Sequence, residues 1–172
     1  TTMGRYNLRL AKRFVETELK MKVYYGDTDS LYVACNPAYF LEYDRDYFTG
    51  KIDKLTYGTR LVEETFKQID IAKHRVNEYL ISDNGSKFLK MAYEEVLFPA
   101  AFLSKKKYFG VPHEENVDFY PRKLFIRGLE VVKRGTSNVL KDVVNEVLAE
   151  VMDLQNARDI LDVVKQAIVR VF

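Results

Sequence analysis

The segment Tyr25-Gly26-Asp27-Thr28-Asp29-Ser30 carries two carboxylates two positions apart. Hard divalent cations such as Mg²⁺ take oxygen ligands and keep waters and substrate phosphates as well. The competing interpretation of an isolated Asp-x-Asp pair is a solvated turn, because Gly and Asp favour turns. Here the β-type runs 21–25 and 30–34 flank the pair. The sequence therefore predicts a hairpin whose two carboxylates point the same way at its tip, an arrangement that suits phosphoryl transfer.

Two basic segments lie farther along the chain. The first is Lys105-Lys106-Lys107-Tyr108, and the second is Arg127-Gly128-Leu129-Glu130-Val131-Val132-Lys133-Arg134. A solvated, charged strand end is the competing interpretation of the first run. Residues 105–134 hold eight basic against four acidic residues, so a local excess of four positive charges is hidden in a whole-chain net charge of +2. The average alone would argue against a nucleic-acid binder, whereas the local excess favours one.

These segments resemble the motifs of the family B DNA polymerases, in the family's order. The tip segment 25–30 is similar to motif C, and 105–108 to a Lys-Lys-Arg/Lys-Tyr motif. Residues 127–134 are similar to Lys-Gly-Leu-Glu-x-x-Arg-Arg, and Thr2-Met3-Gly4-Arg5 resembles the end of the stretch after the fingers motif. The resemblance covers nearly the whole chain and implies the end of a palm domain followed by the start of a thumb.

The resemblance implies roles for the tip residues. Asp29 would ligate the catalytic metals, two Mg²⁺ ions, and Asp27 would support the site with less direct contact. Thr28 and Ser30 would support the turn beside Gly26. Tyr25 would either pack the hairpin or touch the primer end. Motif A and the fingers motif are missing, so the second carboxylate segment of the metal site would come from outside this chain.

The basic residues would contact DNA. The resemblance implies that Lys105, Lys106, Lys107 and Tyr108 meet the primer-template duplex near the insertion site, through groups common to all base pairs. Lys133 and Arg134 would hold the primer backbone farther back. Arg127 replaces the family's lysine and keeps its charge. Beside Gly128, Glu130 would pair with a basic neighbour or cap the strand.

The elements that must position these residues follow from hydrophobic periodicity. The sequence predicts helices over 5–19 and 59–80, a loop with a short helix over 36–55, and strands over 91–98, 107–111 and 123–127. It predicts helices from 138 to the end, with Asn156 as the N-cap of the last one. The expected fold class is α+β: a partial antiparallel palm sheet with packed helices over 1–135, and a helical thumb segment over 136–172.

Composition sets further limits. With 172 residues, 47% hydrophobic and 30% charged, the chain has an ordinary globular composition. One cysteine excludes an internal disulfide and a cysteine-based zinc site. No apolar run is long enough for a membrane helix and no signal peptide opens the chain, so the expected location is intracellular, either the nucleus of a cell or a viral replication site.

The chain is expected to be a fragment cut at both ends that is inactive alone. Its expected partners are primer-template DNA, a deoxynucleoside triphosphate and the remainder of the polymerase chain, with no membrane. One alternative is a truncated or decayed palm that binds nucleic acid without catalysis. Another is a metal-dependent nucleotide-sugar glycosyltransferase, which would need a βαβ pattern before the Asp-x-Asp pair. Here a single predicted helix leads into the hairpin instead.

Overall fold

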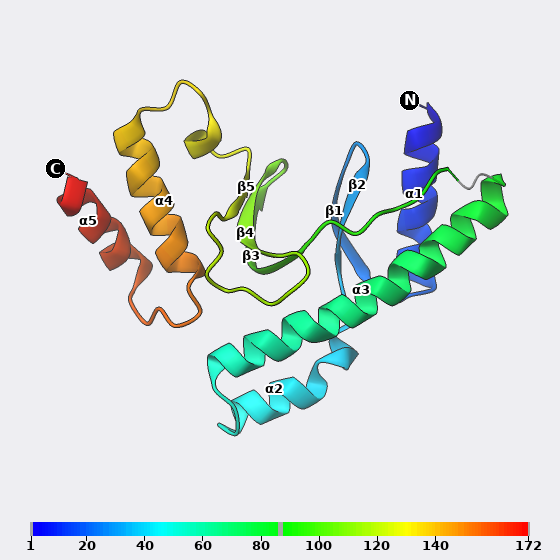
Figure 1. Cartoon of the computed structure of the whole chain (residues 1–172), viewed down its shortest axis with the longest axis horizontal. Coiled ribbons are helices and arrows are strands. Elements are labelled where there is room, and N and C mark those ends of the chain that lie inside the picture. Colours follow the sequence, from blue (N-terminus) through cyan, green and yellow to red (C-terminus); the bar gives the residue numbers. More distant parts are fainter. Residues whose placement is uncertain (1, 86–87, 172) are drawn as a thin grey trace. The chain divides into compact units, whose positions relative to one another are not determined.

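The structure, a computed structural model, describes residues 2–85 and 88–171. The chain forms two compact units: unit 1 comprises Thr1–Ile52 and Arg60–Glu94, and unit 2 comprises Asp53–Thr59 and Glu95–Phe172. Helices combine with two small antiparallel sheets (Figure 1), so the predicted α+β class is confirmed. Within the described ranges, no helix is long and apolar enough to cross a membrane.

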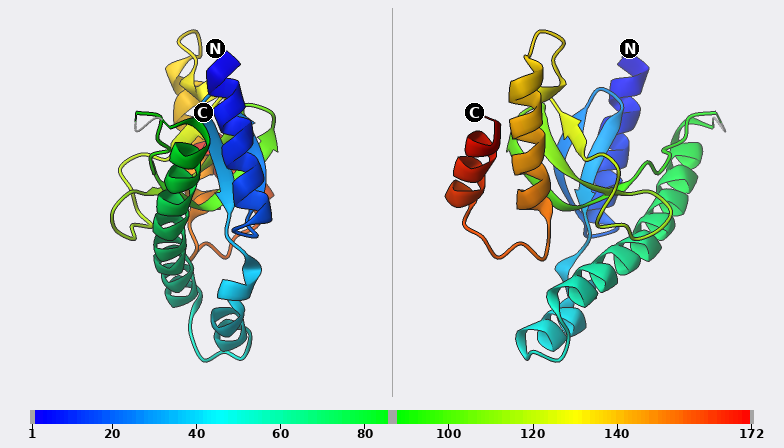
Figure 2. Two further views of the ribbon diagram at one scale, coloured as in Figure 1. Left: turned by 90° about the vertical axis from the view of Figure 1, so that its right-hand side faces the viewer. Right: turned by 60° about the vertical axis from the view of Figure 1, so that its left-hand side comes forward.

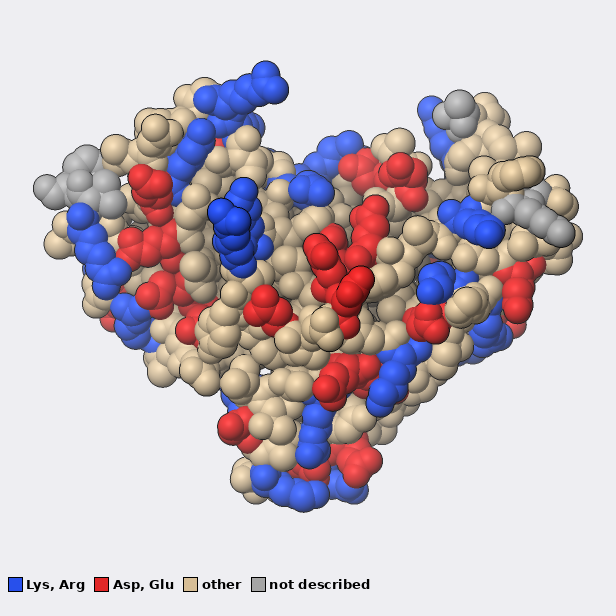
Figure 3. All heavy atoms as spheres, viewed as in Figure 1, with Lys and Arg blue, Asp and Glu red and all other residues tan. Residues whose placement is uncertain are grey.

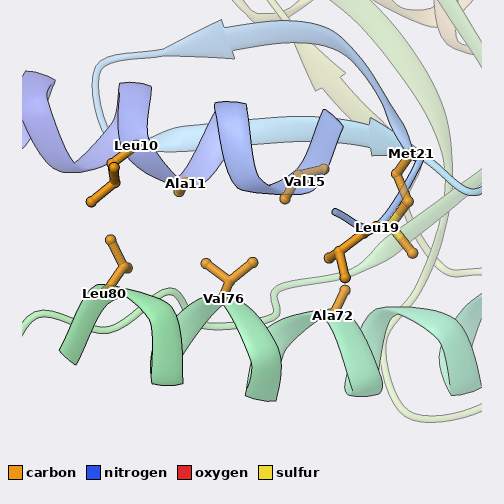
Figure 4. Close-up of a cluster of buried hydrophobic side chains, with 8 residues drawn as sticks. All are labelled: Leu10, Ala11, Val15, Leu19, Met21, Ala72, Val76 and Leu80. Carbon is orange, nitrogen blue, oxygen red and sulfur yellow. The ribbon is translucent and has the colours of Figure 1, made fainter. Parts of the chain in front are cut away.

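Unit 1 is built on two helices and the predicted hairpin. Helix α1 (Thr2–Thr17) leads into β1 (Lys22–Asp27) and β2 (Ser30–Ala34), and α1 lies along this hairpin in both views of Figure 2. Helix α3 (Lys54–Asn84) faces α1 across a core of small and branched apolar side chains. Figure 4 shows these side chains pointing toward one another: Leu10, Ala11 and Val15 from α1, and Ala72, Val76 and Leu80 from α3.

Helix α3 begins earlier than its apolar stripe predicts. The backbone N–H of Thr56 donates to the Asp53 carboxylate at 2.7 Å, and the N–H of Tyr57 donates to the Asp53 carbonyl at 2.9 Å. Asp53 therefore acts as the N-cap, and the first turn forms before the apolar periodicity starts.

The segment between the hairpin and α3 contains a 3-10 turn, η1 (Pro37–Tyr39), and a short helix, α2 (Leu41–Phe48), as the predicted loop with a short helix requires. Its anchor is Asp46, which is only 5% exposed. The Asp46 carboxylate pairs with Lys51 at 3.0 Å and with Arg60, on α3, at 3.1 Å. These contacts lower the pKa of Asp46, the hydrogen bond from Lys51 most strongly, so the carboxylate stays ionised.

Unit 2 holds a three-stranded antiparallel sheet in the order β3-β4-β5, formed by β3 (Val96–Ser104), β4 (Lys107–His113) and β5 (Phe125–Arg127). The predicted strand over 91–98 is wrong at both ends, because β3 starts at Val96 and runs through Pro99. The β3–β4 register shifts between Leu97 and Ala100, which marks a bulge. A proline, which lacks an N–H, is tolerated at a bulge in an edge strand, so Pro99 does not end β3.

Two helices, α4 (Asn138–Met152) and α5 (Ile160–Val171), complete unit 2. Leu148 and Met152 of α4 pack against Phe109 and Val111 of β4 to form the second core. The predicted N-cap of α5, Asn156, is wrong by about one turn. Asp159 is the N-cap, because its carboxylate accepts the backbone N–H of Leu161 at 2.8 Å, whereas the Asn156 side chain accepts the N–H of Arg158.

Candidate active site and nucleic-acid interface

The hairpin of unit 1 contains a β-bulge at Tyr24, two residues before Gly26. Val23 lies opposite Val33, but Tyr25 lies opposite Tyr32, so β1 has one residue more than β2 in this interval. Residues directly opposite each other in an antiparallel pair project from the same face. The face of Val23 and Val33 packs on the core of unit 1.

The bulge decides which way the first carboxylate points. Beyond the bulge, Tyr25 and Tyr32 share the face opposite the core, and their rings stack with centroids 5.8 Å apart. Asp27 lies opposite Ser30 on this same outer face. In an unbroken strand, residues 23, 25 and 27 would share one face, so the bulge is what turns Asp27 away from the core.

The tip of the hairpin is a two-residue turn held in a strained conformation. Thr28 has φ of 50°, the left-handed region that a β-branched residue rarely adopts. The N–H of Asp29 donates to the Asp27 carbonyl at 2.5 Å, and the Ser30 hydroxyl donates to the same carbonyl at 3.2 Å. The Thr28 hydroxyl donates to the Asp27 carboxylate at 3.2 Å. Thr28 and Ser30 therefore support the turn, and Asp29 is exposed at its apex.

The tip offers hard oxygen donors but not a complete metal site. Asp27 is half-buried and Asp29 is exposed, and both carboxylates suit Mg²⁺. Across residues 2–85 and 88–171, no three His, Cys, Asp or Glu side chains gather as metal ligands. The two carboxylates fit Mg²⁺ in donor type.

In unit 2 the basic run forms the turn between β3 and β4. Ser104 lies opposite Lys107, so Lys105 and Lys106 are the two turn residues, and Lys106 has a left-handed φ of 64°. All three lysines are exposed. A two-residue hairpin turn projects its side chains away from the sheet, so these cations form a compact exposed group.

Gly128 connects the second basic segment to this turn. It has φ of 69°, and a Cβ built on it would lie 1.9 Å from the carbonyl oxygen of Lys106. Only a residue without a side chain allows this approach. Because Tyr108 lies opposite Arg127 in the β4–β5 ladder, the two segments that are separate in sequence meet at one corner of the sheet.

Tyr108 differs from the lysines before it because it is only 5% exposed. Its ring stacks between Phe102, with centroids 5.2 Å apart, and Phe125, at 6.1 Å. The Arg127 guanidinium in turn lies 4.2 Å from the centroid of the Phe125 ring, a cation–π contact. The aromatic stack thus fixes the strand ends that carry Lys107 and Arg127.

The chain after Gly128 forms a 3-10 turn, η2 (Glu130–Val132), from which Lys133 and Arg134 project into solvent. The Glu130 carboxylate pairs with the Lys133 ammonium. Lys133 and, more weakly, Lys107 lower the pKa of Glu130, so its carboxylate stays ionised. Of the two interpretations of Glu130 left open by sequence, pairing with a basic neighbour is the one that the structure has.

Two features of these surfaces are absent from the sequence prediction. One is the bulge at Tyr24, which has no signature in residue type. The other is the contact of Gly128 with Lys106, for which the glycine immediately after a predicted strand was the available signal. Figure 3 shows both acidic and basic side chains on the visible face.

Comparisons with known proteins give one family and several relatives. The model of a family described as DNA polymerase family B matches residues 55–172. The chain is 37% identical over 162 residues to "DNA polymerase beta" of African swine fever virus, a match that covers 92% of this chain and 13% of the relative.

Two further relatives come from other sources. "DNA polymerase" of Pyramimonas orientalis virus is 31% identical, covering 98% of this chain and 12% of the relative. "DNA polymerase delta catalytic subunit" of Glycine max is 27% identical, covering 98% and 14%. The chain therefore spans only 12–14% of the length of these curated relatives.

Proposed function

Because the chain belongs to DNA polymerase family B, we propose that it supplies two parts of a template-directed, Mg²⁺-dependent DNA polymerase. The β1–β2 tip carries catalytic carboxylates, and the corner formed by the β3–β4 turn, β5 and η2 binds the primer-template duplex. The observation that carries the proposal is the tip itself: a bulge and a strained turn hold Asp27 and Asp29 clear of the core. Strained backbone of this kind persists where surrounding structure imposes it, and it gathers at functional sites.

The proposed metal ligands are Asp29 and, with less direct contact, Asp27. When bound, Mg²⁺ would supply positive charge beside the primer hydroxyl and the nucleotide phosphates. The chain's own contribution is to fix the carboxylates. The Thr28 hydroxyl holds one oxygen of Asp27 in place, and the hydrogen bonds at the Asp27 carbonyl hold the turn that presents Asp29. The stacked Tyr25 and Tyr32 rings stiffen the outer face beneath them.

The proposed duplex contacts are the exposed cations of the corner in unit 2: Lys105, Lys106, Lys107, Arg127, Lys133 and Arg134. Lysine and arginine at phosphates hold a duplex without reading its sequence, as a polymerase requires. Tyr108 takes part beside them through its buried ring, which sets the position of Lys107 and Arg127. Gly128 allows the two cationic segments to approach each other. Gly26 lies in β1 immediately before Asp27.

The proposal also concerns the parts that this chain does not supply. We assign residues 1–135 to the end of a palm domain and 136–172 to the start of a thumb. The remaining metal ligands and the site for the deoxynucleoside triphosphate come from the remainder of the polymerase chain, so the 172 residues alone bind duplex but do not extend a primer. The small share of the relatives that the chain spans supports this.

The enzyme acts where DNA is replicated, in the nucleus of a cell or at a viral replication site. The glycosyltransferase alternative is not supported, because the described strands pair only in antiparallel fashion and a βαβ unit needs parallel strands. The relatives' names also contain no glycosyltransferase.

The test replaces Asp29 by asparagine (Asp29→Asn) in the full-length polymerase. The metal's stabilisation of charge in the transition state is worth several kcal/mol, so loss of this ligand should lower the rate of primer extension by about 10³-fold. Duplex affinity should stay within about twofold, because the substituted position lies outside the cationic corner. The matched control is Asp142→Asn, which removes an exposed carboxylate from α4 and leaves extension unchanged. Extension by Asp29→Asn at the unaltered rate, or extension by the isolated 172-residue chain, contradicts the proposal.

A further inference from the structure

Glu130 is an acid placed within the cationic corner of unit 2. Lys107 and Lys133 are its charged neighbours, and Arg127 and Arg134 lie close to it in sequence. A carboxylate at this position repels the phosphates that the corner is proposed to bind. Its presence is therefore not explained by duplex binding alone.

The carboxylate of Glu130 is committed to one cation. It forms an ion pair with the Lys133 ammonium, three residues later, across the η2 turn. Both side chains are well exposed, at 64% for Glu130 and 57% for Lys133. An exposed pair of this kind is weak and screened by salt, so a phosphate group that approaches Lys133 can displace the carboxylate.

The backbone of this turn does not depend on the carboxylate. The carbonyl oxygen of Glu130 accepts the N–H of Lys133 at 3.0 Å and the hydroxyl of Thr136 at 2.6 Å. Val131, only 7% exposed, anchors the turn from its inner side. Replacing the Glu130 carboxylate by an amide therefore leaves the turn in place and removes the negative charge that faces Lys133 and, more weakly, Lys107.

We propose that Glu130 is an affinity-limiting residue: its carboxylate competes with DNA phosphate for Lys133 and so lowers the hold of this corner on the duplex. The inference rests on the proposed function. Each phosphate contact must break when a polymerase advances along its product, and an internal carboxylate that takes the cation back makes that release easier. Lys133 thus exchanges between the Glu130 carboxylate and a DNA phosphate, so it does not stay bound to the DNA.

The size of the effect follows from counterion release. One additional phosphate contact steepens the dependence of log K on log salt by about 0.9. Over a tenfold decrease in salt, one additional contact is therefore worth about eightfold in affinity. E130Q should accordingly bind duplex more tightly than the unaltered chain near 0.1 M salt, by up to about eightfold if the carboxylate withholds Lys133 from the DNA completely, with the two curves meeting near 1 M.

The experiment measures fluorescence anisotropy of a labelled primer-template duplex with the 172-residue chain over a series of salt concentrations. E130Q is compared with E115Q, which makes the same charge change at the exposed Glu115, in the segment between β4 and β5. E115Q is expected to change affinity by less than about twofold because salt screens distant charges. The double variant E130Q/K133Q should lose the gain and the additional slope, because the freed cation is then absent.

A second measurement is independent of DNA. Brief acetylation followed by mass spectrometry reports the accessibility of Lys133, which should react several-fold faster in E130Q, whereas the exposed Lys123 should react equally in both proteins. Weaker or unchanged duplex binding by E130Q, an unchanged salt slope, or a gain that survives in E130Q/K133Q overturns the inference alone. Absence of duplex binding by the unaltered chain contradicts the proposed duplex surface as well.

Discussion

Replacing Gly128 by Ala tests the contact that joins the two basic segments of unit 2. Gly128 has φ of 69°, and its Cβ position lies 1.9 Å from the Lys106 carbonyl oxygen. A left-handed conformation costs a residue with a Cβ about 1–2 kcal/mol. Because the neighbour is a backbone atom in a two-residue turn, relieving the clash needs a shift of about 1 Å, and such overpacking costs about 1–3 kcal/mol more. We expect Gly128→Ala to destabilise unit 2 by about 2–5 kcal/mol in total.

Two other glycines separate the backbone contribution from the steric one. Gly50 has φ of 72° with nothing within 4 Å of its Cβ position, so Gly50→Ala pays only the conformational cost. Gly135 also has open space around its Cβ position and carries no left-handed φ, so Gly135→Ala should be neutral or slightly stabilising. The difference between Gly128→Ala and Gly50→Ala isolates the contact with Lys106.

The assay is urea unfolding followed by circular dichroism, together with duplex binding by anisotropy at fixed salt. Because the β3–β4 turn must move to accept the methyl group, Gly128→Ala should also lose duplex affinity, whereas Gly50→Ala should keep it. The reasoning is refuted if Gly128→Ala and Gly50→Ala lower the free energy of unfolding by equal amounts relative to the unaltered chain. It is also refuted if Gly128→Ala is destabilised but binds duplex normally.

Two further predictions concern groups that hold loops in place. The fully buried His113 ring accepts the N–H of Asp118 at Nδ1 (2.9 Å), so Nε2 donates to the Phe98 carbonyl at 2.7 Å and the ring is neutral. Burial lowers the pKa of His113, so as the pH falls the unfolded chain takes up a proton on this histidine before the folded chain does. The neutral ring therefore contributes its full stabilisation above about pH 6.5, and this stabilisation is lost as the pH falls toward the folded pKa. Urea midpoints at pH 7.5 and 5.5 should therefore differ more for the unaltered chain than for His113→Ala, and an equal difference contradicts this. Asn77 donates to the Met91 carbonyl at 2.9 Å and accepts the Met91 N–H at 2.7 Å, so Asn77→Ala should cost about 1–3 kcal/mol in urea unfolding; Asn77→Asp, which keeps the acceptor, should lose less, and equal losses would be inconsistent with two separate bonds.

The hairpin illustrates how far local pattern extends. Two β-type runs around a Gly-Asp-Thr-Asp segment are enough to predict two strands and a turn with two carboxylates at its tip, because alternation and turn preference act over a few residues. The stripe of Leu10, Ala11 and Val15 likewise predicts α1, since the helical period alone gathers these residues on one face. The residue types at the tip and in the lysine run also indicate the chemistry without any tertiary information.

The register of the strands depends instead on pairing between segments that are separate in the sequence. Tyr24 bulges because β2 offers one partner fewer, and the side of the hairpin on which Asp27 lies depends on this pairing. Pro99 stays within β3 because a neighbouring strand accepts a bulge there, although proline by itself suggests an end. Such outcomes depend on residues far away in the chain, which short-range patterns do not contain.

The sequence by itself predicted which residues carry the proposed chemistry, and it determined the kinds of element on which they lie: two aspartates at a hairpin tip, and cations at strand ends. Only the tertiary structure decided how they are held. The Gly128 approach to Lys106, the burial of Tyr108 between two aromatic rings and the pairing of Glu130 with Lys133 all arise at one corner of a sheet. Residue type sets the charge and the local conformation, whereas the packing of strands that are distant in sequence sets which groups meet.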